Sequence, residues 1–406
     1  MQLKWERNKK DNKDTMNCTE KKTMIIKAAT EEEAGAARCL KEGGLVAFPT
    51  ETVYGLGADG LNPEASKKIY AAKGRPSDNP LIVHIADVEA LEELAYTNEK
   101  AYTLAHAFWP GPLTIILPKK DIVPKETTGG LDTVAIRMPS HPAALSLIRQ
   151  SGVYVAAPSA NLSGRPSPTK VEHVIEDMDG RVDYIIDGGP VGIGIESTIV
   201  DLSGDVPTIL RPGYITKSML EDMVGEVMMD PALERPIEME AKGIRPKAPG
   251  MKYTHYAPKG ELTLVEAGSK ETHKDVDVST KPDINNMENV QAAGKNDEER
   301  FAAERTQDVA DKIRSLAKEK REQGFKVGIM APVETISLYG GYADIVVCVG
   351  DRSKQSTVAA GLYAALREFD DKGAEYIYAE SFRGDGLSYA IMNRLLKAAG
   401  QRVIYV

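Results

Sequence analysis

The chain has 406 residues, of which 42% are hydrophobic and 27% are charged, and its formal net charge is −9. This composition is typical of a globular protein long enough for two domains, and the acidic balance argues against a surface dominated by nucleic-acid binding, although a local basic cleft is compatible with it. No apolar run approaches the roughly 20 residues that a membrane-spanning helix needs, and the first residues lack the apolar core of a secretory signal. Three cysteines lie far apart, which predicts neither a disulfide framework nor a thiolate zinc site. We therefore expect a cytoplasmic protein without membrane attachment.

The first 22 residues are polar and charged with little periodicity, and we expect a flexible tail over 1–22. Regular patterns begin with an apolar strand at 24–28. Acidic residues follow Thr30, the expected N-cap, and predict a helix that runs to Lys41 and stops at Gly43-Gly44.

Two apolar runs then flank a polar, Gly-rich segment. Residues 45–48 and 81–85 read as strands, and the segment between them contains the turn Lys73-Gly74-Arg75-Pro76. This turn places two cations and a glycine where a phosphate group could bind.

The remainder of the first domain, which we expect to span 23–225, is rich in strands. The apolar pattern predicts helices at 88–108 and 142–150 and strands at 113–117, 133–137, 153–157, 184–187, 197–201 and 208–211. Because strands and helices do not alternate strictly, we expect a mixed twisted sheet.

Residues 226–260 carry five prolines between 230 and 259, which predicts a fairly stiff interdomain linker. Beyond it, residues 261–406 form a second pattern, interrupted by a polar insertion at about 268–300. Strands alternate with helices here, which is typical of a smaller Rossmann-like parallel α/β domain. No GxGxxG turn follows its strands, so we assign it no dinucleotide.

Common catalytic motifs are absent from the sequence. It contains no Walker A loop, no HExxH and no GxSxG, and its six histidines show no metal-ligand spacing. We therefore expect neither a covalent nucleophile nor a metal held by the protein. What remains is a set of cations, hydroxyls and amides at strand ends, where open α/β sheets bind ligands: Lys73, Arg75, Arg137, Ser159, Asn161, Ser163, Ser167, Ser197, Thr198 and Arg211.

Each of these features also has a purely structural interpretation. A single arginine at a strand end can be a surface ion-pair residue, and Lys-Gly-Arg-Pro can be an ordinary basic turn. Ser159-Ala-Asn161 can be a capped turn, and His84 can be a satisfied core histidine. Tyr253-Thr-His-Tyr256 can be linker packing. The residues by themselves support no more than an anion-binding α/β enzyme.

Several multi-residue blocks, taken together in order and spacing, narrow this conclusion. They are PTETVYGLG, KGRPSDNPLIVH, TVAIRMPSHP, APSANLSGRPSPT, IESTIVD and RPG. Over about residues 24–225 the chain resembles the YrdC-like threonylcarbamoyl-adenylate synthase family. The linker PGMKYTHYAP and the domain behind it resemble the longer, two-domain Sua type of that family.

The resemblance implies a reaction and its partners. L-threonine, bicarbonate or carbon dioxide, and ATP would give threonylcarbamoyl-AMP and pyrophosphate, with Mg²⁺ accompanying the nucleotide. The product would pass to the machinery that transfers the threonylcarbamoyl group to the adenosine beside the anticodon of ANN-decoding tRNAs. Direct tRNA binding is left open.

The resemblance also assigns residues to the two substrates. The nucleotide would contact Arg75, Asn79, Thr133, Ser159, Ser167, Arg211 and Tyr256. Threonine would contact Thr52, His84, Arg137, the backbone at Ala157, and Ser197. Lys73 and Arg75 would hold the charge of the reacting groups, and the linker would be a lid that excludes water.

Two other functions compete with this hypothesis. The YrdC-like fold can present a concave basic surface, so a double-stranded RNA or tRNA-binding module is the main alternative. A carbamoyl-adenylate enzyme that uses carbamoyl phosphate, as in hydrogenase maturation, is the second, but the chain lacks the zinc-finger cysteine pattern that such an enzyme requires.

Overall fold

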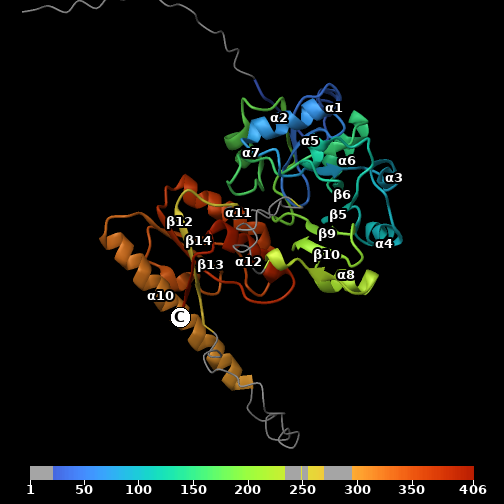
Figure 1. Ribbon diagram of the computed structural model, residues 1–406. Coiled ribbons are helices and arrows are strands. Elements are labelled where there is room, and N and C mark those ends of the chain that lie inside the picture. Colours follow the sequence, from blue (N-terminus) through green and yellow to red (C-terminus); the bar gives the residue numbers. More distant parts are fainter. Residues whose placement is uncertain (1–21, 234–247, 249–254, 269–294) are drawn as a thin grey trace, which may run out of the picture.

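The computed structural model describes residues 22–233, 248, 255–268 and 295–406, and Figure 1 shows them as two α/β parts side by side. The expected tail up to residue 21, the centre of the expected linker and most of the expected insertion lie outside the described residues. The sequence predicted helix from 301 onward after the insertion, but the helix already begins at Lys295.

The first part is built on one sheet of eleven strands in the order β1-β8-β2-β3-β7-β4-β6-β5-β9-β10-β11. Parallel pairs such as β4 with β6 alternate with antiparallel pairs such as β5 with β6, which confirms the predicted mixed sheet. The strands are β1 (Met24–Lys27), β2 (Val46–Phe48), β3 (Gly55–Asp59), β4 (Ile82–His84), β5 (Leu113–Pro118), β6 (Thr133–Arg137), β7 (Val155–Ala156), β8 (Tyr184–Asp187), β9 (Thr198–Asp201), β10 (Thr208–Arg211) and β11 (Met228–Met229).

Helices cover this sheet, and side-chain caps mark the start of some of them, although the predicted N-cap Thr30 does not cap α1, whose N-cap position is Glu32. They are α1 (Glu33–Lys41), α2 (Pro63–Lys73), α3 (Ala90–Leu94), α4 (Glu99–Phe108), α5 (Lys125–Thr128), α6 (Pro142–Ser151), α7 (Val171–Met178) and α8 (Lys217–Val224). The Asn62 side chain caps α2 by accepting from two backbone amides, and Gly74 ends it with φ 60°. These caps place Arg75 directly beyond the helix. The single helix predicted over 88–108 was wrong, because Asn98 is extended and caps a separate helix α4.

The second part is a five-stranded sheet in the order β14-β13-β15-β12-β16, and all its pairs are parallel. This confirms the predicted Rossmann-like architecture. Its elements are β12 (Glu261–Glu266), α10 (Lys295–Glu322), β13 (Val327–Ala331), the 3₁₀ helix η3 (Ile336–Tyr339), β14 (Ile345–Cys348), α11 (Gln355–Asp371), β15 (Tyr376–Glu380), α12 (Leu387–Ala398) and β16 (Val403–Tyr405), with a further 3₁₀ turn η1 (Pro231–Leu233) after β11. Helices α11 and α12 lie on the face toward the first part, and α10 lies on the opposite face (Figure 1).

One apolar cluster crosses from the first part to the second. Ile195, which precedes β9, packs in the same buried cluster as Leu362 of α11 and Tyr256 of the linker. The loop before β9 approaches α11 so closely that a Cβ at Gly194 would lie 2.4 Å from the Ala360 Cα, and the φ of Gly194 is +85°. Only glycine fits there without displacing the helix. The second part therefore rests directly on the loop that leads into β9.

Candidate functional site

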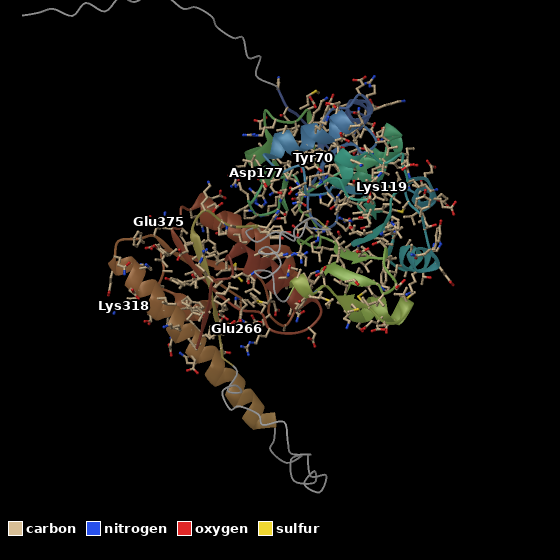
Figure 2. All side chains as sticks on the ribbon, viewed as in Figure 1. Tyr70, Lys119, Asp177, Glu266, Lys318 and Glu375 are labelled. Carbon is tan, nitrogen blue, oxygen red and sulfur yellow. The ribbon has the colours of Figure 1, made fainter. Side chains whose placement is uncertain are left out.

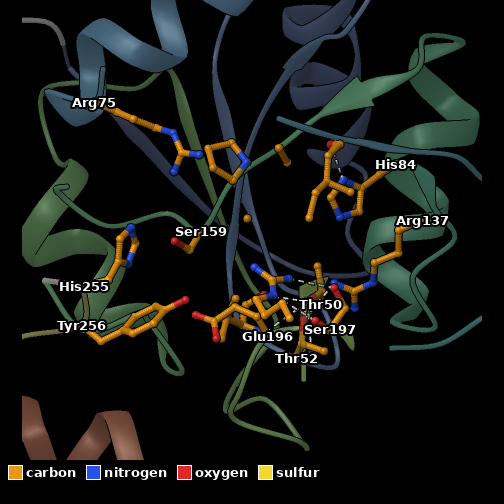
Figure 3. A pocket seen from close by; sticks show the side chains of 16 residues that line it. Thr50, Thr52, Arg75, His84, Arg137, Ser159, Glu196, Ser197, His255 and Tyr256 are labelled. Atoms are coloured by element: carbon orange, nitrogen blue, oxygen red, sulfur yellow. Dashed lines mark hydrogen bonds between the residues drawn. The ribbon is translucent and has the colours of Figure 1, made fainter. Parts of the chain in front are cut away.

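A buried pocket lies at the strand ends of the first sheet, where β4, β6 and β10 finish and where the linker returns (Figure 3). Nine of the residues that the sequence assigned to substrates line this pocket: Thr52, Arg75, His84, Arg137, Ala157, Ser159, Ser197, Arg211 and Tyr256. They come from segments far apart in the chain, and the sheet brings them together. Three of them are arginines, each less than a tenth exposed.

One side of the pocket is organised around Arg137, the last residue of β6. Its Nη1 donates to the Thr52 hydroxyl at 3.0 Å, and its Nη2 donates to the Glu51 carboxylate at 2.7 Å. His84 ends the neighbouring strand and pairs in register with Arg137. Burial, followed by the positive charge of Arg137, lowers the pKa of His84 to about 3. The imidazole is therefore neutral at physiological pH.

A second group surrounds Ser197, the residue just before β9. Arg211, at the end of β10, donates from Nε to the Ser197 carbonyl and from Nη2 to its hydroxyl, both at 3.1 Å. The same hydroxyl lies 2.8 Å from the Thr114 hydroxyl on β5. These hydrogen bonds connect β5, the start of β9 and the end of β10, and they fix the orientation of the Arg211 side chain.

The basic turn after α2 supplies the third group. The Arg75 Nη2 donates to the carbonyls of Asn79 and Pro80 at 3.4 and 3.2 Å. Burial lowers the pKa of Arg75 to about 10, so it stays charged at neutral pH. Its Nε and the Asn79 Oδ1 are buried without a hydrogen-bond partner among the described residues. Unsatisfied buried polar atoms are costly, and a bound polar ligand is one way to satisfy them.

Four predicted site residues do not line the pocket: Lys73, Asn79, Thr133 and Ser167. The Lys73 ammonium donates to the carbonyls of Ser159 and Asn161, so it holds the turn that follows β7. Burial, and then the charge of Arg75, lower its pKa well below the usual value. Thr133 lies half-buried at the start of β6, at the far end of that strand from Arg137.

The pocket also contains residues that the sequence reasoning did not single out, namely Thr50, Glu196 and His255. Glu196 and His255 sit inside the quoted blocks IESTIVD and YTHYAP, next to residues that were chosen. Each has an ionisable side chain and directly precedes a residue that was assigned to a substrate: Glu196 precedes Ser197, and His255 precedes Tyr256. That position in the sequence could have identified both.

Glu196 is the centre of a buried network that joins the two parts of the chain. It accepts hydrogen bonds from the Ser167 hydroxyl at 2.6 Å, from the Tyr363 hydroxyl of α11 at 2.8 Å, and from Arg394 Nε of α12 at 3.2 Å. Burial alone would raise the pKa of Glu196, but Arg394, Arg211 and the Ser167 hydroxyl lower it to about 2. The Glu196 carboxylate is therefore ionised at neutral pH and accepts hydrogen bonds from all three of these side chains.

A second arginine of the C-terminal part holds the loop that carries Ser167. Arg367 of α11 donates to the Pro166 carbonyl and to the Asp177 carboxylate on α7, each at 2.7 Å. Its side chain is 1% exposed. Figure 2 shows Asp177 on the side of the first part that faces the second.

The linker closes the pocket with His255 and Tyr256. The Tyr256 ring lies 5.1 Å from the Tyr363 ring, and the His255 ring lies 4.5 Å from Tyr256. The amide of Ala257 donates to the Gly164 carbonyl at 2.9 Å, which ties the linker to the loop after β7. Burial, followed by the charge of Arg75, lowers the pKa of His255 to about 3.

This arrangement suits chemistry that needs no covalent nucleophile. Buried arginines, hydroxyls and neutral imidazoles surround a space that is also lined by the linker residues His255 and Tyr256, and such groups can position anions and stabilise developing charge. Within the described residues, no group of three or more His, Cys, Asp or Glu side chains could hold a metal ion. No helix in the described ranges is both long and apolar enough to cross a membrane.

The fold and the pocket together define a two-part α/β protein with a buried, arginine-lined pocket at the strand ends of its first sheet. Residues 38–213 match the Sua5/YciO/YrdC family model, described as "Telomere recombination". Residues 215–400 match a model described as "Threonylcarbamoyl-AMP synthase, C-terminal domain". The chain therefore belongs to the Sua5/YciO/YrdC family, in its two-domain Sua5 form.

Individual relatives agree with this assignment. The chain is 49% identical over 373 residues to a threonylcarbamoyl-AMP synthase from Bacillus subtilis, which covers 91% of this chain and 94% of that protein. It is 45% identical over 373 residues to one from Pyrococcus abyssi, covering 91% and 95%. A crystal structure of P. abyssi Sua5 complexed with L-threonine matches with a TM-score of 0.78 and 43% identity, covering 95% of this chain and 99% of that chain.

Proposed function

We propose that the protein is a threonylcarbamoyl-AMP synthase. It combines L-threonine, bicarbonate or carbon dioxide, and ATP into threonylcarbamoyl-AMP and pyrophosphate. The observation that carries the proposal is the convergence of nine predicted substrate contacts, three of them buried arginines, on one pocket. The similarity to named synthases supports the same reaction.

Threonine occupies the side of the pocket formed by the ends of β4 and β6. The Arg137 guanidinium attracts the amino-acid carboxylate, and the hydroxyl of Thr52, held by Arg137 at 3.0 Å, is placed for the polar groups of the substrate. His84 is neutral and so adds no charge beside the substrate amine. The complex of P. abyssi Sua5 with L-threonine supports this choice of amino acid.

The nucleotide occupies the opposite side, between the basic turn and the linker. Arg75 and Arg211 approach the phosphates, Ser159 adds a hydroxyl, and Tyr256 covers the nucleotide. Asn79, Thr133 and Ser167 lie outside the pocket lining, and we retain them as nucleotide contacts that form when ATP binds. Lys73 then acts through the turn that it holds, by keeping Ser159 in place.

The chemistry proceeds in two steps. The threonine amine attacks carbon dioxide and loses a proton, which forms the carbamate; bicarbonate enters the same step after losing water, so that one water is released for each bicarbonate consumed. A carbamate oxygen then attacks the α-phosphorus, the bond to the bridging oxygen breaks, and pyrophosphate leaves with the electron pair. Positioning by Arg137 and charge stabilisation by Arg75 and Arg211 supply the catalysis.

Mg²⁺ is expected to arrive with ATP. Glu196 is the carboxylate that lines the pocket, and Arg394 already pairs with it, so the described residues favour a metal held by the phosphates. Such an ion would neutralise part of the triphosphate charge. We further propose that the product serves the threonylcarbamoyl modification of ANN-decoding tRNA in the cytoplasm, through a transfer machinery downstream.

The test is pyrophosphate release by the full chain with ATP and Mg²⁺, measured with threonine and bicarbonate together and with each omitted. Release that requires both supports the proposal, and release that ignores threonine would exclude it. RNA binding is measured alongside at several salt concentrations. Salt-sensitive affinity for RNA without any turnover would favour the RNA-binding alternative, and turnover driven by carbamoyl phosphate would favour the hydrogenase-maturation chemistry.

A further inference from the structure

The C-terminal sheet has a topological switch point of its own. The connection from β12 runs through α10 to β13, whereas the connection from β15 runs through α12 to β16. Helices α10 and α12 lie on opposite faces of the sheet (Figure 1), although β12 and β15 are paired neighbours. In open parallel α/β sheets, ligands bind in the crevice between the carboxyl ends of two strands whose connections diverge in this way.

A cavity of about 250 Å³ occupies this crevice. Ala267, which follows β12, lines it, as do Glu380 at the end of β15 and Ser381 and Arg383 beyond. Arg352, from the loop between β14 and α11, completes the polar wall, and α10 forms an apolar side. Figure 2 shows Glu266 at the carboxyl ends of the strands, where the cavity lies, and Glu375, which precedes β15, at their amino ends.

A buried carboxylate fixes Arg352 at the rim of the cavity. Glu380 is 3% exposed and accepts from the hydroxyls of Thr335 and Tyr339 and from Arg352 Nη2, the last two at 2.7 Å. Arg352 Nη1 donates to the Ser381 carbonyl at 2.9 Å, and the guanidinium lies 4.9 Å from the Phe382 ring centroid. The Arg352 side chain nevertheless remains 39% exposed.

The second cation is fixed in the same way. Arg383 Nε donates to the Glu266 carboxylate at 2.6 Å and Nη2 donates to the Ala267 carbonyl, and the side chain remains 46% exposed. Two guanidinium groups are therefore anchored from behind by carboxylates and still border an open cavity. Such preorganised planar forks match the geometry of phosphate and carboxylate groups.

We propose that this cavity is a second ligand site, which binds a small molecule through one phosphate or carboxylate group held by Arg352 and Arg383. The turn after β15 reads Ser381-Phe-Arg-Gly-Asp-Gly386, without the GxGxxG spacing, and the cavity is smaller than typical cofactor pockets of roughly 300–1,000 Å³. Both facts favour a small oxyanion ligand over a dinucleotide. The site is separate from the pocket of the first sheet and does not depend on the reaction proposed for it.

The test uses hydrogen–deuterium exchange of the full chain, followed in the peptides that cover residues 350–355 and 378–386. Inorganic phosphate, pyrophosphate, AMP and citrate are titrated separately, so that phosphate and carboxylate ligands are told apart. At least one of them should give saturable protection of both peptides. Arg352→Gln and Arg383→Gln should each weaken that protection about tenfold or more, because each removes a charged hydrogen-bonding fork.

Arg321→Gln is the matched control. Arg321 is 40% exposed, and its Nε lies 3.3 Å from the Asp344 carboxylate. It also borders a cavity, but that cavity lies at the amino ends of the strands of the same sheet. It should bind the anion as the unmodified chain does, and Arg383→Lys should retain part of the affinity. Absence of saturable protection, or protection in Arg352→Gln and Arg383→Gln as strong as in the unmodified chain, would overturn the proposal. Protection that vanishes in Arg75→Ala but survives in Arg383→Gln would likewise overturn it, by assigning the effect to the other pocket.

Discussion

Replacing Arg394 by methionine tests the ion pair that joins the second part of the chain to the pocket. The Arg394 side chain is 1% exposed and its Nε lies 3.2 Å from the Glu196 carboxylate, which is 8% exposed. Removing one partner of such a buried pair typically costs about 3–5 kcal/mol, because the other charge stays buried without compensation. The fall in the pKa of Glu196 from 4.5 to about 2 corresponds to about 3 kcal/mol for all its surroundings together, and Arg394 is the largest of the groups that lower this pKa.

The sign of the pH dependence follows from the same shift. The folded pKa of Glu196 lies below its unfolded value, so its contribution to stability is complete above about pH 5 and is lost as the pH falls toward 2. Without Arg394 the pKa of Glu196 rises, and the loss of stability should begin at a higher pH.

Urea unfolding of three variants, followed by circular dichroism at several pH values, measures both effects. Arg394→Met should lose about 3 kcal/mol or more of the free energy of unfolding, and Arg394→Met combined with Glu196→Gln should recover part of it. Lys27→Met is the control, because Lys27 is 77% exposed in its pair with Asp187 and should leave the free energy of unfolding close to that of the unmodified chain. If Arg394→Met loses no more than Lys27→Met, or if the double variant recovers nothing, the buried pair is not what holds the two parts together.

Further substitutions separate binding from structure. Arg75→Ala should abolish threonine-dependent pyrophosphate release in a chain that still folds, with a somewhat lower unfolding midpoint because Arg75 also donates to two carbonyls, whereas Arg149→Ala, at an arginine 53% exposed, should change neither activity nor midpoint. Lys73→Met should lower activity and also the unfolding midpoint, because it removes the donor to two buried carbonyls; activity lost at an unchanged midpoint would instead place Lys73 on the substrate. His84 is neutral when folded, so the free energy of unfolding should fall as the pH drops from about 6.5 toward 3, and His84→Asn should flatten that slope; an unchanged slope would contradict the low pKa. Tyr363→Phe keeps the ring against Tyr256, whereas Tyr363→Leu removes both the ring and the hydroxyl. The Michaelis constant for ATP should therefore rise less in Tyr363→Phe than in Tyr363→Leu, and an equal rise in both variants would show that the hydroxyl alone matters.

The sequence predicted the architecture well where local patterns determine it. Apolar runs identified both sheets, although β3 and β11 were not among the predicted strands. Polar residues that follow such runs, including Arg137 and Arg211, do meet at one pocket, although β5 and β9 lie between β6 and β10 in the sheet. The break within 88–108 was missed because helical periodicity continues across it. The extended backbone and side-chain cap of Asn98, and not the apolar pattern, end the first helix and start the second.

The network around Glu196 could not be predicted in this way. Its partners Tyr363 and Arg394 lie 167 and 198 residues further along the chain, and neither helix that carries them shows a periodic sign of a partner. From sequence alone, a charged residue in a helix, such as Arg394 in α12, is ordinarily expected to face solvent. Here the second sheet brings α11 and α12 against the first part, and burial converts those charges into the contact between the two parts.

This contact makes the second part a component of the pocket and not only an attachment to it. Tyr363 donates to Glu196, Glu196 accepts from Ser167, and the Tyr363 ring is also the surface on which Tyr256 lies. The packing of Tyr256 over the pocket and one of the hydrogen bonds to Glu196 therefore depend on the same residue of α11, Tyr363. A change that moved α11 away would remove the ring against which Tyr256 lies and also the Arg367 contact to Pro166, which anchors the loop that carries Ser167. Under the proposed reaction, the water-sensitive intermediate would then be exposed at the same moment that a nucleotide contact is lost.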